Sequence, residues 1–358
     1  MRCAACNGEF TDGVLICPFC GEEAGAGDAG DPLLGRVLSG KFRVIEEIGV
    51  GGMGRVYRAE QIPLGIDVVV KVLQPSLASD QEIVSRFFRE GKAAAMLRHP
   101  NSIQIFDFGE SEGTLYLAME YLRGRPLDIA LEEDGPLPID RVVDIATQVL
   151  SVLDAAHRAS IVHRDLKPEN IMIENVAGQR DFVKVVDFGI AKVLDPLRGD
   201  GHKLTRTGSI LGTPAYMAPE QVLAEPVDTR TDFYALGVIC FEMLTGRQPF
   251  EGDRISDVLR AHISRPPPSL KELRPDVPDA LQRAVEDALA KDPASRPQTA
   301  DAFKNQLTSF RNRRSESKTI SESKRPAAIK CSGCGNATLP GGKFCRECGA
   351  PLAPAKPD

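Results

Sequence analysis

The sequence lacks any stretch of about 18 uncharged apolar residues, which is the length that a membrane-spanning helix needs. Residues 1–6 have no apolar core of the kind found in signal peptides. We therefore expect a cytoplasmic protein without a membrane span. The 358 residues are 42% hydrophobic and 26% charged, and this composition excludes collagen, a coiled coil and a fully disordered chain.

The chain also has only a small excess of negative charge. The formal net charge is −6 at pH 7, which argues against nucleic-acid binding as the main function. The charge is unevenly spread, because the beginning of the chain is acidic whereas residues 311–330, RNRRSESKTISESKRPAAIK, are basic. We interpret this basic run as a solvated tether; the alternative is docking to nucleic acid, anionic lipid or the acidic beginning of the chain.

Cysteine is grouped at the two ends of the chain. Two sets share the spacing C-x2-C-x10-C-x2-C: Cys3, Cys6, Cys17 and Cys20, and then Cys331, Cys334, Cys345 and Cys348. The ninth cysteine, Cys240, lies in an apolar run and is predicted to be a small buried hydrophobe.

Each cysteine set is suited to a metal. Two thiolates on a tight turn point to one side, and two such turns supply the four corners of a tetrahedron, which Zn2+ prefers. Two disulfides per set are the alternative, although a cytosolic protein keeps its thiols reduced. Both sets resemble the short zinc ribbons that accompany many bacterial and archaeal proteins. The resemblance implies two Zn2+ sites, at residues 1–21 and 331–350, and an unknown protein partner.

The region between the cysteine sets divides into two parts. Up to about residue 122, β-branched and alternating runs predict strands, interrupted by one helical stretch at about 81–97. From residue 139 on, helical periodicity dominates. The fold class is therefore α+β, with a small β-rich lobe followed by a larger helical lobe. The boundaries we expect are 1–21 ribbon, 22–38 flexible linker, 39–310 main domain, 311–330 basic Ser-rich linker, 331–350 ribbon and 351–358 tail.

Two motifs in the β-rich part suit phosphate binding. Residues 49–56 read GVGGMGRV, a G-x-G-x-x-G-x-V loop whose backbone N–H groups can approach phosphate oxygens. A strand-like segment follows the loop, which argues against a dinucleotide-binding fold, where a helix would follow. Lys71 ends the next strand. Glu90 on the helical stretch is its candidate partner, and Glu82 is a competing one.

Three further motifs follow in order. Residues 163–170 read HRDLKPEN, residues 187–189 read DFG and residues 218–220 read APE. Together with the glycine-rich loop and the strand lysine that precede it, this series resembles the signature set of protein kinases. The resemblance covers residues 39–310 and is to bacterial Ser/Thr kinases of the eukaryotic-like (Hanks) type. It implies the two-lobed protein kinase fold with a zinc ribbon at each end.

The resemblance implies a role for each motif residue. Asp165 matches the catalytic base, Lys167 a residue that steadies the transferred phosphoryl group, and Lys71 the phosphate-binding lysine held by Glu90. Mg2+ or Mn2+ would be held by Asn170 and Asp187. The residues that match the ATP site are Ile48, Gly49, Gly51, Gly54, Val56, Val69, Lys71, Met119, Glu120, Leu122 and Met172.

The resemblance also implies how the enzyme is regulated and braced. Thr205 and Thr207 lie where related bacterial kinases autophosphorylate, and Ser209 on the same loop is a further candidate phosphorylation site. Arg164 would pair with the added charge. Asp232 matches a helix residue that braces the catalytic loop, and Arg296 matches the partner of Glu220.

The resulting hypothesis is an ATP-dependent Ser/Thr protein kinase that acts on protein substrates, with the ribbons as interaction or sensing modules. One alternative is a signalling scaffold that recruits partners through its ribbons, with catalysis secondary. Another is a kinase linked to nucleic acid by its ribbons and basic tether.

Overall fold

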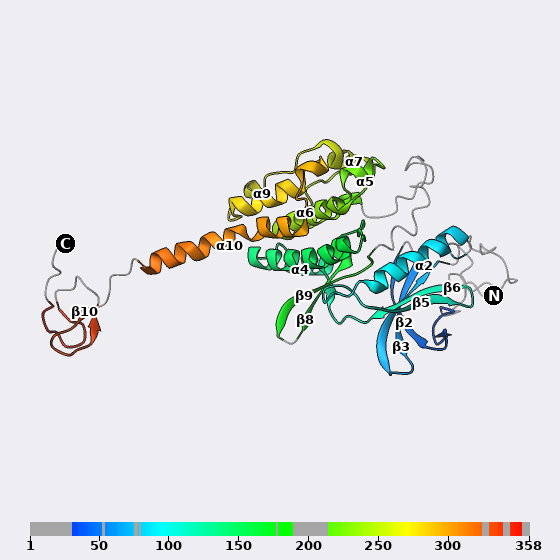
Figure 1. Ribbon diagram of the computed structural model, residues 1–358, viewed down its shortest axis with the longest axis horizontal. Helices are drawn as coiled ribbons and strands as arrows, with labels where there is room; N and C mark the ends of the chain where they lie inside the picture. The colour runs from blue at the N-terminus through cyan, green and yellow to red at the C-terminus, as the bar shows by residue number, and fades with distance from the viewer. Residues whose placement is uncertain are drawn as a thin grey trace, which may run out of the picture.

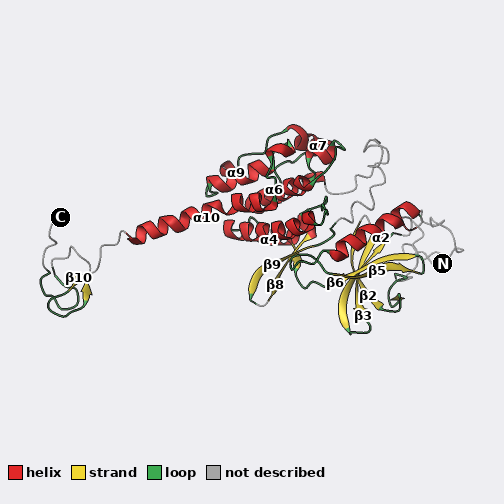
Figure 2. Ribbon diagram, viewed as in Figure 1, coloured by secondary structure: helices red, strands yellow, loops and turns green. Residues whose placement is uncertain are grey.

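The computed structural model describes residues 31–51, 54–74, 78, 80–176, 178–188, 214–323, 329–338 and 344–352. Some predicted sites lie outside the described residues: Cys3, Cys6, Cys17, Cys20, Thr205, Thr207 and Ser209. The described chain forms a strand-rich N-lobe and a helical C-lobe, as the α+β prediction requires (Figures 1 and 2).

The N-lobe is built on an antiparallel sheet with the strand order β1-β2-β3-β4-β6-β5. The strands are β1 (Val37–Leu38), β2 (Phe42–Gly51), β3 (Gly54–Gln61), β4 (Ile66–Leu73), β5 (Ile105–Ser111) and β6 (Thr114–Glu120). Asp80 caps the start of helix α2 (Gln81–Met96): its side chain accepts hydrogen bonds from the N–H groups of Glu82 and Ile83.

The alternation of side chains along β6 supplies two separate cores. Leu115, Leu117 and Met119 belong to the cluster that includes buried residues of α2. Tyr116 and Ala118 point to the other face of the sheet and join a second cluster. This period of two is what an extended strand buried on both faces produces.

The C-lobe is helical except for a three-stranded sheet with the order β7-β8-β9. Its strands are β7 (Arg125–Pro126), β8 (Ile171–Val176) and β9 (Gln179–Val185). Its α-helices are α3 (Leu127–Asp134), α4 (Ile139–Arg158), α5 (Pro219–Val222), α6 (Thr229–Thr245), α7 (Ile255–Ser264), α8 (Leu270–Leu273), α9 (Asp279–Ala288) and α10 (Ala300–Ser323). Short 3-10 helices lie at Pro168–Asn170, Pro214–Tyr216 and Pro293–Ser295.

Helix α6 forms the centre of the C-lobe core and packs against α4 and α9 (Figure 1). Its residues are buried on almost all sides, which accounts for its nearly continuous apolar sequence. Cys240 on this helix is fully buried, as predicted, and burial raises the pKa of its thiol to about 12. Helix α4, where the predicted helical periodicity begins, buries apolar residues along its whole length.

Two predicted linkers differ from the structure. The flexible linker expected at residues 22–38 is wrong for its last part, because β1 pairs with β2 and Leu38 is buried in the N-lobe. The basic linker expected at 311–330 begins as a helix, since α10 continues to Ser323. Beyond it, β10 (Ile329–Lys330) pairs with β11 (Ala337–Thr338). No helix in the described part of the chain has the length and apolar character needed to cross a membrane.

Candidate active site

Lys71 and Asp187 meet between the lobes. Lys71 is fixed in β4, where it pairs with Val56 on one side and Leu117 on the other. Its Nζ lies 2.7 Å from Oδ2 of Asp187, which follows β9 with a left-handed backbone (φ 63°). Burial works against ionisation of this carboxyl, but the Lys71 ammonium outweighs it and holds the pKa of Asp187 below its usual value. The side chain of Glu90 lies outside the described part, so its pairing with Lys71 stays a prediction.

A second polar group stands on the loop that precedes β8. The Asn170 amide nitrogen donates to the Asp165 carbonyl oxygen at 2.7 Å, and Lys167 Nζ lies 3.7 Å from Asp165 Oδ2. The Val186 N–H donates to the Asn170 carbonyl at 2.9 Å, which joins this loop to the segment that carries Asp187. The structure thus brings together five residues that the motifs singled out.

Asp232 braces the loop that carries Asp165, as predicted. This fully buried carboxylate on α6 accepts hydrogen bonds from the backbone N–H groups of His163 and Arg164, both at 2.9 Å. His157 Nε2 lies 2.7 Å from the same carboxylate. The contact of His157 was not predicted, because its place in the last turn of α4 gives no signal of a partner 75 residues away.

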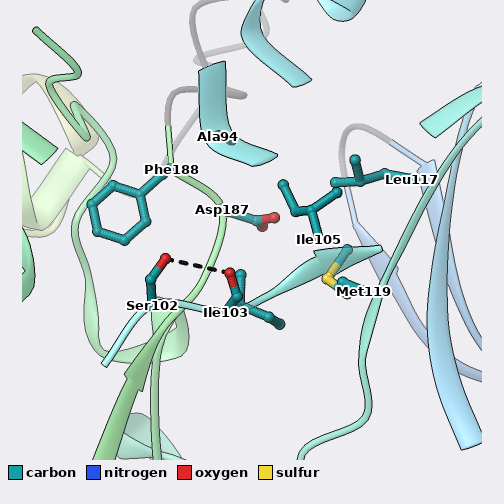
Figure 3. A pocket seen from close by; sticks show the side chains of 8 residues that line it. All are labelled: Ala94, Ser102, Ile103, Ile105, Leu117, Met119, Asp187 and Phe188. Carbon is teal, nitrogen blue, oxygen red and sulfur yellow. Dashed lines mark hydrogen bonds between the residues drawn. The ribbon is translucent and has the colours of Figure 1, made fainter. Parts of the chain in front are cut away.

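The His163 side chain also connects the loop to the DFG segment. Its ring packs at 4.8 Å from the ring of Phe188, and its Nε2 lies 2.9 Å from the Val186 carbonyl oxygen. A cavity of about 10 Å³, room for about one water molecule, lies beside Phe188, Asp187 and Met119 (Figure 3).

The residues assigned to the ATP site lie on or next to several strands of the two lobes. Val69 pairs with Met119, and Val69 and Leu122 pack against the cluster that contains Met119. Gly49 pairs with Val56 across the β2–β3 hairpin, and Gly51 pairs with Gly54. Met172 lies on β8, and Ile48 is exposed.

Gly54 and Glu120, two of the residues assigned to the ATP site, make close contacts with neighbouring strands. A side chain at Gly54 would place its Cβ 1.9 Å from the Val72 carbonyl oxygen, so only glycine allows the hairpin to approach β4 this closely. Glu120 accepts hydrogen bonds through its carboxylate from Lys184 Nζ and the Gln104 N–H, both at 2.7 Å. These bonds hold the end of β6 against β9.

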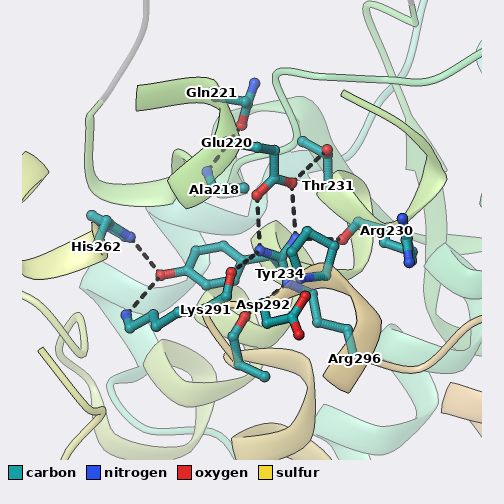
Figure 4. Close-up of polar contacts among 12 residues, drawn as sticks. Ala218, Glu220, Gln221, Arg230, Thr231, Tyr234, His262, Lys291, Asp292 and Arg296 are labelled. Carbon is teal, nitrogen blue, oxygen red and sulfur yellow. Dashed lines mark hydrogen bonds and ion pairs between the residues drawn. The ribbon is translucent and has the colours of Figure 1, made fainter. Parts of the chain in front are cut away.

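A buried ion pair supports the C-lobe (Figure 4). Both carboxylate oxygens of Glu220 accept hydrogen bonds from Arg296 at 2.8 Å, and the Thr231 hydroxyl donates to one of them at 2.7 Å. Burial opposes ionisation, yet these donors hold the pKa of Glu220 below its usual value. The predicted partnership of Glu220 and Arg296 is confirmed.

The C-terminal cysteines form a four-thiol cluster. The Sγ atoms of Cys331, Cys334, Cys345 and Cys348 all lie within 4.8 Å of one another. Two of the separations are 3.6 Å (Cys331–Cys348) and 3.8 Å (Cys334–Cys345). A tetrahedron with metal–sulfur bonds of about 2.3 Å has edges of about 3.8 Å. The cluster therefore fits one tetrahedral metal ion.

The two cysteine turns have the geometry that the motif predicted. The N–H groups of Gly335 and Gly349 each donate at 2.9 Å to the first cysteine carbonyl of their turn, and both glycines have a left-handed backbone (φ 75° and 71°). The described cysteines are free of disulfides.

Comparisons with known proteins agree with this geometry. The family model described as protein kinase domain matches residues 42–308. The chain is 49% identical over 280 residues to the serine/threonine-protein kinase pkn3 of Myxococcus xanthus, covering 77% of this chain and 51% of that protein. It is 39% identical over 269 residues to the serine/threonine-protein kinase PrkC of Bacillus subtilis, covering 75% and 40%.

Solved structures give the same result. The crystal structure of the PknI kinase domain of Mycobacterium tuberculosis is similar with a TM-score of 0.61 and 29% identity, covering 77% of this chain and 98% of that chain. The chain spans about half the length of the curated relatives with which it aligns over the kinase region.

Proposed function

The chain belongs to the protein kinase family, and we propose that it transfers the γ-phosphoryl group of ATP to Ser or Thr hydroxyls of protein substrates. The observation that carries the proposal is the Lys71–Asp187 pair at 2.7 Å, beside a loop that holds Asp165 and Asn170 in contact. The names of the relatives as serine/threonine kinases support the choice of Ser and Thr.

The proposed mechanism divides the work among these side chains. Asp165 orients the substrate hydroxyl and accepts its proton, while Lys167, close to Asp165, places a positive charge beside the transferred group. Lys71 binds the phosphates of ATP. Positioning cations around a phosphoryl group that carries negative charge accounts for most of the catalysis.

Asn170 and Asp187 are suited to hold Mg2+ or Mn2+. The Asn170 amide nitrogen is committed to the Asp165 carbonyl, which leaves its amide oxygen as the ligand atom. Lys71 engages one oxygen of Asp187, so the other is left for a metal. Oxygen ligands from one or two side chains plus substrate phosphates are the usual set for Mg2+. When bound, the ion neutralises charge on the β- and γ-phosphate oxygens.

The experiment is phosphorylation by the full chain with Mg2+ and labelled ATP, beside an Asp165→Asn variant of equal thermal stability. We expect label on Ser or Thr of the wild-type protein and none on the variant. Mapping by mass spectrometry would test Thr205, Thr207 and Ser209 as autophosphorylation sites. Equal labelling of the variant would remove Asp165 from its role. Absence of label from both proteins, on themselves and on added protein substrates, would favour the scaffold.

We propose that the four-thiol cluster at residues 331–348 binds one Zn2+, and that the N-terminal set with the same spacing binds another. All-thiolate ligands at tetrahedral separations suit Zn2+. The metal content of purified protein should be two zinc ions per chain, and one in a Cys334→Ser, Cys348→Ser variant. No change in metal content would contradict the proposal.

The ribbons are proposed as interaction or sensing modules in the cytoplasm, where thiols stay reduced. A protein partner captured by the wild-type chain and lost with the same double variant would support this role.

A further inference from the structure

We propose that residues 31–38 form a clamp that positions the glycine-rich β2–β3 hairpin, with Asp31 as its positioning residue. The segment precedes the region that the kinase family model matches, residues 42–308. The inference rests on the proposed ATP-dependent function, because its consequence is a change in ATP binding.

Asp31 is tightly held. Its Oδ2 accepts hydrogen bonds from Arg55 Nη1 and the Tyr57 hydroxyl, both at 2.7 Å, and its Oδ1 accepts one from the Leu33 N–H at 3.0 Å. The side chain is only 11% exposed. Burial opposes ionisation, but the bonds from Tyr57, Leu33 and Arg55 outweigh it and lower the pKa of Asp31. Asp31 is therefore a charged acceptor at neutral pH.

The partner Arg55 stands at the base of the glycine-rich hairpin. It directly follows Gly54 and pairs with Val50 of the opposite strand. The same Nη1 atom lies 3.1 Å from Oε2 of Glu47 on β2. Arg55 thus connects Asp31 to both strands of the hairpin. It does so next to Gly54, the residue that approaches β4 closely.

Apolar contacts hold the rest of the clamp to the sheet. Leu38 is buried in the cluster that contains Tyr57, and Leu33 packs against the same cluster. Val37 and Leu38 pair with β2 in register. The fully buried ring of Tyr57 on β3 therefore has its hydroxyl satisfied by a residue from outside the matched domain.

This arrangement predicts an effect on ATP binding more than on chemistry. A hairpin held in its binding conformation loses less conformational freedom when ATP binds. The hydrogen bonds of Asp31 within the described part of the chain go to Leu33, Arg55 and Tyr57 and not to the catalytic groups, so phosphoryl transfer from bound ATP should change little. Because the Arg55 side chain is half exposed, its ion pair with Asp31 is of modest strength, and its loss corresponds to a rise of roughly twofold to fivefold in the KM for ATP.

The test compares Asp31→Ala, Arg55→Ala and the double variant in the full chain. Asp31→Ala should raise the KM for ATP by that factor, with kcat changed by less than about twofold. If Asp31 acts through Arg55, the double variant should have the same KM as Arg55→Ala alone. The matched control is Glu60→Gln, which breaks the exposed Arg43–Glu60 pair on the same two strands and should leave the KM unchanged.

Amide hydrogen exchange without nucleotide separates the clamp from the proposed function. Asp31→Ala should speed exchange in residues 46–51 and 54–58 and leave residues 117–120 of β6 unchanged. This result would support the clamp even in a protein that transfers no phosphate, which would overturn only the kinase proposal. Three results for Asp31→Ala would overturn the clamp: unchanged exchange in the hairpin, an unchanged KM for ATP, or a faster exchange that is equal in the hairpin and in β6 and accompanies a lower Tm.

Discussion

Replacing Glu220 by glutamine should destabilise the C-lobe, because Arg296 would keep a buried charge without its counterion. The Arg296 side chain is 0% exposed and the Glu220 side chain 5% exposed. Arg296 also donates to the carbonyl oxygens of Ala290, Lys291 and Arg230, so it cannot turn towards water without breaking several bonds.

The size of the effect follows from the burial of the pair. Removing one partner of a buried ion pair costs about 3–5 kcal/mol. Glutamine keeps one acceptor oxygen, so we expect the lower end, about 3 kcal/mol. For a domain of this size, a loss of 1 kcal/mol lowers the Tm by about 2–4 °C, which predicts a fall of roughly 6–12 °C.

The assay is thermal unfolding of the full chain at pH 7, followed by circular dichroism. Glu60→Gln in the exposed pair with Arg43 is the matched control and should leave the Tm nearly unchanged. Replacing Glu220 by Leu and Arg296 by Met together should recover part of the loss, because no charge is then left buried. A fall of less than about 2 °C for Glu220→Gln, with cooperative unfolding, would refute the reasoning.

Further predictions concern pH, backbone space, the loop brace and the metal. The pKa of Glu220 is lower in the folded chain, so its contribution is complete above the ordinary Glu pKa of about 4.3 and is lost as the pH falls through the folded value; the Tm difference between wild type and Glu220→Gln should therefore shrink below about pH 4. Gly54→Ala should weaken ATP binding measured by calorimetry, because the new Cβ would clash with the Val72 carbonyl; unchanged affinity would show that the hairpin can shift. Asp232→Asn should lower kcat at least tenfold, since three donors lose a charged acceptor; wild-type kcat in a steady-state assay would contradict its bracing role. Chelation of zinc should unfold residues 329–352 as seen by hydrogen exchange, because about twenty residues cannot form a core alone; unchanged protection would mean that the cluster needs no metal.

Periodicity and motif order were sufficient to predict the main elements. The strand-rich region up to about residue 122 and the helical periodicity from residue 139 were expected from residue spacing alone, because the strands and α4 each bury a regular set of side chains. The contacts of Asp232 and Arg296 followed from the family resemblance.

The clamp at residues 31–38 could not be predicted from the sequence. The Gly- and Ala-rich composition just before Asp31 is typical of a flexible linker, and β1 is only two residues long. What orders the segment is a set of bonds from Asp31 to Arg55 and Tyr57, more than twenty positions away, and local patterns carry no signal of such partners.

The helical start of the basic segment was missed for a different reason. Arg, Lys and Glu are good helix formers, but residues 311–323 show no apolar stripe that would distinguish a helix from a solvated linker. The helix there continues from the packed part of α10, whose Phe303 and Leu307 are fully buried.

The most direct test of the central claim is transfer of labelled γ-phosphate from ATP to a protein Ser or Thr, measured for the wild-type chain and for Asp187→Asn. The geometry predicts transfer that requires Mg2+ or Mn2+ and falls at least a hundredfold in the variant, about 2.7 kcal/mol in the barrier. Transfer by a folded Asp187→Asn protein at the wild-type rate would contradict the assignment of this site.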